Sequence, residues 1–231
     1  MALSKLTDIF SCLIVCQQLI LISKKQKYRW FKETKNTLRG AKEKMKVKVN
    51  DYRFDQNLFK GFIGKTFNKY KHKRFLFTNT VSIYLGFMVD NISYEICNDF
   101  EPVDFLDIDG EATICRINQK PWSEILSNND RVIEIEIEKT IKSITIINDN
   151  FISRSYGEIN YDWWETRAII FNFGEVEVSF EKQDCFFSME IEVNKGYDLI
   201  NKVEDGKFII SDFEQSDEQT IEVNREIIKL Q

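Results

Sequence analysis

The chain has 231 residues, with 32 Lys/Arg, 37 Asp/Glu and a net charge of −5. Its 43% hydrophobic and 13% aromatic content, with only two Pro, excludes a disordered linker protein and predicts a packed core. The charge is distributed unevenly, because residues 1–74 carry 19 basic and 5 acidic side chains and residues 75–231 carry 13 and 32. An excess of +14 is therefore followed by one of −19, and an acidic, aromatic-rich region is typical of a protein that meets a basic partner.

The first 44 residues differ from the rest of the chain. An apolar stretch from Leu6 to Ile22 is interrupted by Asp8, Gln17 and Gln18, and a basic run follows it. This pattern leaves open a membrane anchor within residues 1–23, an amphipathic helix followed by a basic helix, and a non-native extension upstream of Met45. A secretory signal is disfavoured, because a single Lys5 precedes the apolar run and charges follow where a cleavage site requires small residues.

Residues 45–231 are expected to form one domain of the α+β class, mainly antiparallel sheet built from hairpins and meanders, with one or two short helices. Counted from Met45, the domain has 22 basic and 34 acidic residues, a net charge of −12. The five cysteines are an odd number without a Cys-x-x-Cys pair, which favours free thiols and a cytoplasmic location. The alternative location is the inner membrane, through the N-terminal apolar segment.

Short apolar runs punctuated by turn residues predict the strands of the first half of the domain. The expected strands are Met45–Val49, Phe75–Phe77, Val81–Val89, Ser93–Ile96, Val103–Ile108 and Ala112–Ile117. Asp90-Asn91 fits a two-residue hairpin turn, because both residue types tolerate positive φ, and Asp109-Gly110 is expected to form another turn. Pro121–Leu126 is predicted to be a brief helix with Pro121 in its first turn.

The second half of the domain shows the clearest strand pattern. Ile133, Ile135 and Ile137 alternate with Glu134, Glu136 and Glu138, which predicts a strand with one core face and one acidic, solvated face. Further expected strands are Ile141–Ile147, Ala168–Phe173, Val176–Phe180, Phe186–Val193 and Thr220–Leu230. A turn is expected at residues 148–150 and a short helix at residues 196–203. Glu175, Glu177, Glu181, Glu190 and Glu192 are expected on a solvated face or edge.

Catalytic and metal-binding signatures are weak. The only histidine, His72, lies in a lysine run, and Asp104, Asp107 and Asp109 do not complete a calcium-loop motif. We therefore expect no cofactor, no metal site and no catalytic residue, although a carboxylate-dependent hydrolase remains an alternative. Aromatic and basic residues interleave between Met45 and Arg74, as in single-strand nucleic-acid binding, but the acidic remainder of the domain would repel phosphate.

One polar, aromatic segment before the hairpin of residues 168–180 is the candidate partner-binding site. Aromatic side chains offer large rigid contact area, and the carboxylates beside them would steer a basic partner. We interpret this segment as a recognition loop, although Trp163 or Trp164 could instead anchor a strand in the core. The candidate binding residues are Tyr156, Glu158, Tyr161, Asp162, Trp163, Trp164 and Glu165.

Three stretches carry a resemblance to a known class of proteins: the run from Met45 through Phe62–Phe67, then Arg167–Phe171, and then Ser179–Lys182. Over Met45–Val203 the chain resembles small, β-rich, uncharacterised cytosolic proteins of low-GC bacteria, and is loosely similar to immunity proteins of polymorphic toxin systems. The resemblance implies a non-enzymatic protein that neutralises a bacterial toxin, and it assigns no functional residues. The leading hypothesis is therefore a protein-binding module, with a hydrolase or a membrane-anchored accessory protein as alternatives.

Overall fold

The computed structural model describes residues 47, 49–105, 108–127, 131–183, 186–204 and 219–231. The chain divides into two units at Lys46/Val47, and every described residue belongs to the second unit. The predicted helical extension and the apolar stretch from Leu6 to Ile22 therefore lie outside the described residues. Of the helices in the part of the chain that the structure describes, none is both long and apolar enough to span a membrane.

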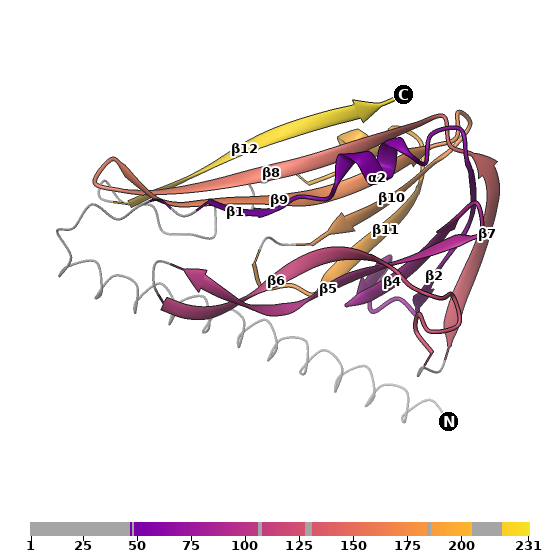
Figure 1. Cartoon of the computed structure of the whole chain (residues 1–231), viewed down its shortest axis with the longest axis horizontal. Helices are drawn as coiled ribbons and strands as arrows, with labels where there is room; N and C mark the ends of the chain where they lie inside the picture. Colours follow the sequence, from indigo (N-terminus) through magenta and orange to yellow (C-terminus); the bar gives the residue numbers. More distant parts are fainter. Residues whose placement is uncertain (1–46, 48, 106–107, 128–130, 184–185, 205–218) are drawn as a thin grey trace, which may run out of the picture. The chain divides into compact units, whose positions relative to one another are not determined.

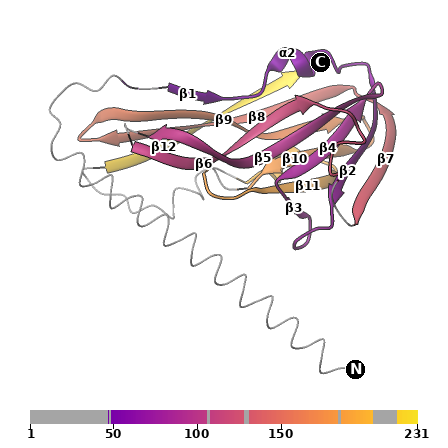
Figure 2. The same ribbon diagram turned by 60° about the horizontal axis from the view of Figure 1, so that its bottom comes forward.

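The described residues form two sheets, which Figure 1 shows as two layers and Figure 2 shows in a second view, turned by 60° about the horizontal axis. Sheet A has the order β12-β8-β9-β10-β11-β3, with β1 added beside β9, and sheet B has the order β6-β5-β4-β2-β7. The strands of sheet A are β1 (Val49–Tyr52), β3 (Thr80–Ser82), β8 (Ser143–Ser155), β9 (Glu158–Asn172), β10 (Glu177–Lys182), β11 (Glu190–Gly196) and β12 (Gln219–Leu230). The strands of sheet B are β2 (Thr66–Lys73), β4 (Tyr84–Val89), β5 (Ile92–Phe105), β6 (Ile108–Gln119) and β7 (Val132–Thr140). All pairings are antiparallel except that of β1 with β9, so the predicted antiparallel architecture is confirmed.

One apolar core joins the two sheets. Phe67 of β2 and Phe87 of β4 contribute to it from sheet B, and Phe171 of β9 and Phe180 of β10 contribute from sheet A. Their rings contact one another, with centroids 4.9 Å apart for Phe67 and Phe171. Because residues two apart on a strand share a face, the apolar alternation of these strands places their rings between the sheets.

Two short helices flank the sheets. Helix α2 (Gln56–Lys60) begins after Asp55, whose side chain accepts a hydrogen bond from the backbone N–H of Asn57 and so caps the helix. A 3-10 helix, η1 (Leu199–Asn201), packs Leu199 against Ala168 and Ile170 of sheet A. It confirms the helix expected at residues 196–203 in part, since only three of these residues are helical and Gly196 ends β11.

The helix predicted at Pro121–Leu126 is wrong, because this segment forms turns. Its buried Ile125 packs against β4, where a Cβ on Gly86 would meet the Ile125 Cγ2 atom at 2.8 Å. Lys71 donates to the Trp122 carbonyl, so contacts with sheet B hold the segment in its irregular conformation.

The hairpin at Asp90-Asn91 is confirmed, since both residues have positive φ, 48° and 63°, and Val89 pairs with Ile92. The last strand and the three-stranded meander of β9, β10 and β11 are also confirmed. Four strand boundaries are wrong. Phe75 has no regular structure and residues 76–77 are bends, Ile83 with φ 67° separates β3 from β4, residues 93–105 lie in the single strand β5, and Asp109-Gly110 lies inside β6.

The turn predicted at residues 148–150 is wrong as well, because these residues lie in the middle of β8. Their polar side chains are buried and bonded to neighbouring strands: Asn148 to Glu226, Asp149 to Arg225, and Asn150 to Asp162. Local turn propensity was therefore overridden by hydrogen bonds that exist only in the assembled sheet.

Candidate partner-binding face

The segment predicted to be a recognition loop is a hairpin turn followed by half a strand. Tyr156 and Gly157, with φ of 52° and 82°, form the turn between β8 and β9. From Glu158 onward the chain belongs to β9, which pairs with β8 along its length and with β1 at Asp162–Glu165. The loop prediction is wrong, since these pairings occupy the backbone hydrogen-bonding groups that a loop would leave to solvent.

Three of the seven candidate residues are buried. Tyr161, Trp163 and Glu165 are 3%, 0% and 3% exposed. The Trp163 ring packs against Tyr52 and Phe186, with centroids 4.5 Å and 5.1 Å away, and its Nε1 donates to Glu165. In this conformation these three side chains are not available to a partner.

Asp162 and Trp164 lie on the opposite side of β9 and are half-exposed. Cross-strand partners share a face, so β1, β8 and β12 add neighbours to this pair. We call the resulting surface the Trp164 face. It consists of Val49, Asp51, Arg53, Ile152, Arg154, Asp162, Trp164, Glu222, Asn224 and Glu226. The remaining two candidates, exposed Tyr156 and Glu158, lie at the hairpin end beside it.

Arg53 is bound at the centre of the Trp164 face. Its guanidinium carbon lies 4.4 Å from the centroid of a Trp164 ring. Its Nε and Nη2 donate to the two carboxylate oxygens of Asp51 at 3.0 and 2.7 Å, and Nη1 lies 3.5 Å from Glu226 Oε2. The hydrogen bonds from Arg53 lower the pKa of Asp51, and the Asp51 carboxylate raises the pKa of Arg53.

The Trp164 face is acidic and amphipathic. Four carboxylates, those of Asp51, Asp162, Glu222 and Glu226, lie with two guanidinium groups, those of Arg53 and Arg154. Arg154 is within 3.6 Å of Glu222, while Val49 is 58% exposed and Ile152 is half-exposed. The arrangement therefore combines an aromatic platform, apolar contact area and an excess of negative charge.

A second group of charged residues lies near the middle of β9. At this point the strand next to β9 changes from β10, which pairs with Ala168–Asn172, to β1, which pairs with Asp162–Glu165. Arg167 is the extra residue of a β-bulge, because Thr166 and Ala168 oppose the consecutive residues Asn148 and Ile147. Beside the bulge, Lys182 Nζ lies 2.6 Å from Glu165 Oε2 and also donates to the Thr113 carbonyl. Burial raises the pKa of Glu165 despite the nearby Lys182.

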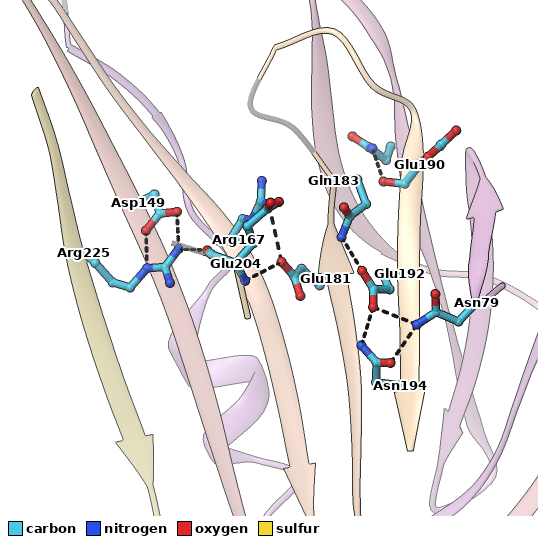
Figure 3. A network of polar contacts seen from close by, with 11 residues as sticks. Asn79, Asp149, Arg167, Glu181, Gln183, Glu190, Glu192, Asn194, Glu204 and Arg225 are labelled. Carbon is cyan, nitrogen blue, oxygen red and sulfur yellow. Dashed lines mark hydrogen bonds and ion pairs between the residues drawn. The ribbon is translucent and has the colours of Figure 1, made fainter. Parts of the chain in front are cut away.

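Figure 3 shows how this group continues through the buried Arg167 and Glu181 to the exposed Glu204 and the half-exposed Arg225. Arg167 Nη2 lies 3.4 Å from Glu181 and 3.5 Å from Glu204, and Arg225 binds both carboxylate oxygens of Asp149. Burial raises the pKa of Glu181 to about 7, against the opposing effect of Arg167. The expectation that Glu181 is solvated is wrong, since it is 2% exposed. We call Asp149, Glu165, Arg167, Glu181, Lys182, Glu204 and Arg225 the bulge cluster.

Glu192 is opposite Glu181 on the neighbouring strand, and amide groups surround it. Its carboxylate accepts hydrogen bonds from Asn79, Asn194 and Gln183 at 2.7–2.8 Å. These three donors satisfy the hydrogen-bonding capacity of a half-buried carboxylate. Glu192 therefore has a structural role within the sheet.

A small cavity lies between the sheets, with room for about one water molecule. Arg167, Lys182, Thr166 and Cys115 line it together with six apolar residues, and no carboxylate does. Burial raises the pKa of Cys115 to about 12 and that of Cys97 to about 11, so neither is a thiolate near neutral pH. Nothing in this cavity favours the hydrolase alternative, which requires two converging carboxylates.

The predicted acidic strand is confirmed as β7, where Glu134, Glu136 and Glu138 are exposed. Ile135 and Ile137 pack against the core, while Ile133 is 38% exposed. Lys69 of β2 lies 2.5 Å from Glu134 and is therefore an ion-pair partner from the basic part of the chain. Part of the negative charge of the domain is thus neutralised internally. On the Trp164 face, two guanidinium groups pair with three of the four carboxylates and leave an excess of two negative charges.

The described residues contain no group of three or more His, Cys, Asp or Glu side chains arranged to hold a metal ion. Comparison with known proteins gives no match to a family model, to a curated protein or to a solved structure. The site must therefore be interpreted from its own geometry.

Sequence reasoning missed most of this face, because only Asp162 and Trp164 of its ten residues were among the predicted binding residues. Asp51 and Arg53 are over 100 residues from Trp164 in the sequence, and Glu222 and Glu226 lie in a separate strand. Only the parallel pairing of β1 with β9 and the long β8–β12 pairing bring these residues together. The one local signal in the sequence was the spacing Asp51-x-Arg53, which permits an ion pair between these two residues. The sequence does not reveal that Arg53 also lies against Trp164.

Proposed function

We propose that this protein is a non-enzymatic binding module, which uses the Trp164 face and the adjacent hairpin turn to bind a basic protein. The observation that carries the proposal is the combination on one sheet face of an aromatic platform with four carboxylates and two guanidinium groups. Aromatic side chains supply much of the binding energy in protein interfaces, and complementary charge supplies association rate and specificity.

The resemblance to bacterial immunity proteins supports a specific form of this proposal. A toxin domain that acts on nucleic acid or membranes is commonly basic, and an acidic face would suit it as a partner. We therefore propose neutralisation of a bacterial toxin in the cytoplasm. The two described cysteines, Cys97 and Cys115, are both free thiols, which fits a reducing compartment.

A peptide titration tests the proposed face. The full chain is titrated with a peptide of alternating Arg and Lys, and with an acidic peptide of equal length, using calorimetry at low salt. In the test variant, Glu158→Gln, Asp162→Asn and Glu222→Gln remove three carboxylates. Asn at position 162 can still accept the hydrogen bond from Asn150 Nδ2. We expect the affinity for the basic peptide to fall at least about tenfold.

The matched control removes three exposed carboxylates, two in strands of sheet B and one in the segment between β6 and β7, through Glu111→Gln, Glu136→Gln and Glu124→Gln. Its net charge changes by the same amount, so it should retain most of the affinity. Equal losses in the two variants would show that only the overall charge matters, and the proposed face would be wrong.

A further inference from the structure

The structure contains an arginine already bound to the Trp164 face. Arg53 is in the irregular segment between β1 and α2, and its side chain lies across Trp164 and between Asp51 and Glu226. Stacking on an indole and a two-point contact with a carboxylate are the interactions by which proteins recognise guanidinium groups. The intramolecular contact therefore shows which side chain this surface is shaped to hold.

We propose that Arg53 occupies the position of a partner's arginine, and that a partner binds by replacing Arg53 on Trp164. This inference rests on the proposed function and deepens it, because it names arginine as the side chain that the face recognises and Arg53 as its internal competitor.

The contacts of Arg53 with Asp51 and Glu226 are weak enough for a partner's arginine to replace them. The side chains of Arg53, Asp51 and Glu226 are 31%, 47% and 42% exposed, and ion pairs at such sites contribute little net stability. No strand backbone has to move when Arg53 rotates away, since it follows the last residue of β1. An incoming guanidinium would then find the same ring and the same carboxylates.

The face can distinguish arginine from lysine. The planar fork of Arg53 contacts both oxygens of Asp51 while its central carbon lies 4.4 Å from the Trp164 ring centroid, and an ammonium group cannot make both contacts at once. Removing Arg53 should therefore favour an arginine peptide more than a lysine peptide of equal charge.

The experiment compares hexa-arginine and hexa-lysine peptides binding to the full chain, measured by calorimetry for the wild type and for Arg53→Gln. Arg154→Gln is the matched control, because it removes another guanidinium from the same face. Among the described residues, Arg154 pairs with Glu222 and makes no cation–π contact with Trp164. We expect R53Q to bind hexa-arginine about threefold to tenfold more tightly than wild type. R154Q should produce only the smaller gain that follows from its charge, equal for the two peptides.

A gain for hexa-arginine in R53Q that matches the gain for hexa-lysine, or matches the gain in R154Q, would overturn the competitor role. Trp164→Leu in the R53Q background must remove the arginine-specific gain, with near-UV circular dichroism used to verify the fold. If hexa-arginine binds the wild type through the carboxylates of the face but R53Q shows no arginine-specific gain, this inference fails and the proposed function stands. If neither peptide binds any variant, the proposed function fails and this inference fails with it.

Discussion

At the scale of single residues, charge that would be costly to bury alone is buried in pairs. The side chains of Glu165 and Lys182 are both shielded from solvent, at 4% and 1% exposed, and they form an ion pair. Removing one partner of such a pair leaves an uncompensated charge in the interior, which typically costs about 3–5 kcal/mol. This is why Glu165, predicted as a binding residue, is better understood as part of the structure that positions β9.

Glu181 should make the stability of the protein depend on pH. Its pKa of about 7 in the folded state lies above its ordinary value of 4.5, so the native state binds more protons than the unfolded state between these two values. Stability should therefore fall as the pH rises from about 4.5 to about 7, by about 3 kcal/mol from this group. Thermal unfolding should show a higher Tm at pH 5.5 than at pH 8.

The variant Glu181→Gln isolates this contribution. It keeps an oxygen that can accept the hydrogen bond from the Glu204 backbone N–H, and it cannot ionise. Glu165 and Glu190 also have raised pKa values and act in the same direction, whereas burial lowers the pKa of His72, which acts in the opposite direction below its ordinary value of 6.5. The comparison of E181Q with the wild type therefore carries the test. An unchanged difference in Tm between pH 5.5 and pH 8 in E181Q would show that Glu181 does not titrate in this range.

At the scale of elements, the β8–β9 hairpin determines where the candidate residues point. Its turn requires positive φ at both Tyr156 and Gly157, as in the two-residue turns that match the twist of a hairpin. Two irregularities in the β8–β9 register, beside Arg167 and Asn160, interrupt the alternation of side chains. The Trp164 face therefore depends on this turn and on these extra residues.

Replacing Gly157 by Ala should destabilise the hairpin by about 1 kcal/mol, because a side chain disfavours φ of +82°. No heavy atom lies within 4 Å of the added Cβ, so backbone strain is the only expected cost. Gly196→Ala is the control, since its Cβ would make only ordinary contacts with Leu199 and Lys202 at 3.7 Å. Equal midpoints for the two variants in urea unfolding would contradict the proposed turn strain.

Sequence patterns predicted elements well where burial alternated along a strand. The Ile/Glu alternation of residues 133–138 and the meander of residues 168–193 both became strands of the expected kind. The patterns failed where polar residues are buried, as at Asn148, Asp149 and Asn150, because their partners come from β9 and β12. The division of the candidate segment into a buried and an exposed side could not be predicted, because it required the register of β9.

At the scale of the whole molecule, the opposite charges of the two parts of the chain are partly combined within one fold. Lys69 of the basic part pairs with Glu134 across β2 and β7, and within the acidic part Lys139 of β7 pairs with Glu175. Such exposed pairs reduce the acidic surface of sheet B without adding much stability. The Trp164 face keeps its negative excess, and we expect its attraction for cations to weaken as salt shortens the screening length from about 30 Å at 0.01 M to about 8 Å at 0.15 M.

The location of a bound basic peptide tests the account most directly. Backbone amide chemical shifts of the isotopically labelled full chain are followed by nuclear magnetic resonance during titration with hexa-arginine. We predict the largest changes at Val49–Arg53, Asp162–Trp164 and Glu222–Glu226, with β7 nearly unaffected. Changes that are largest at Glu134–Glu138, or that spread evenly over all exposed carboxylates, would contradict the assignment of the Trp164 face as the binding surface.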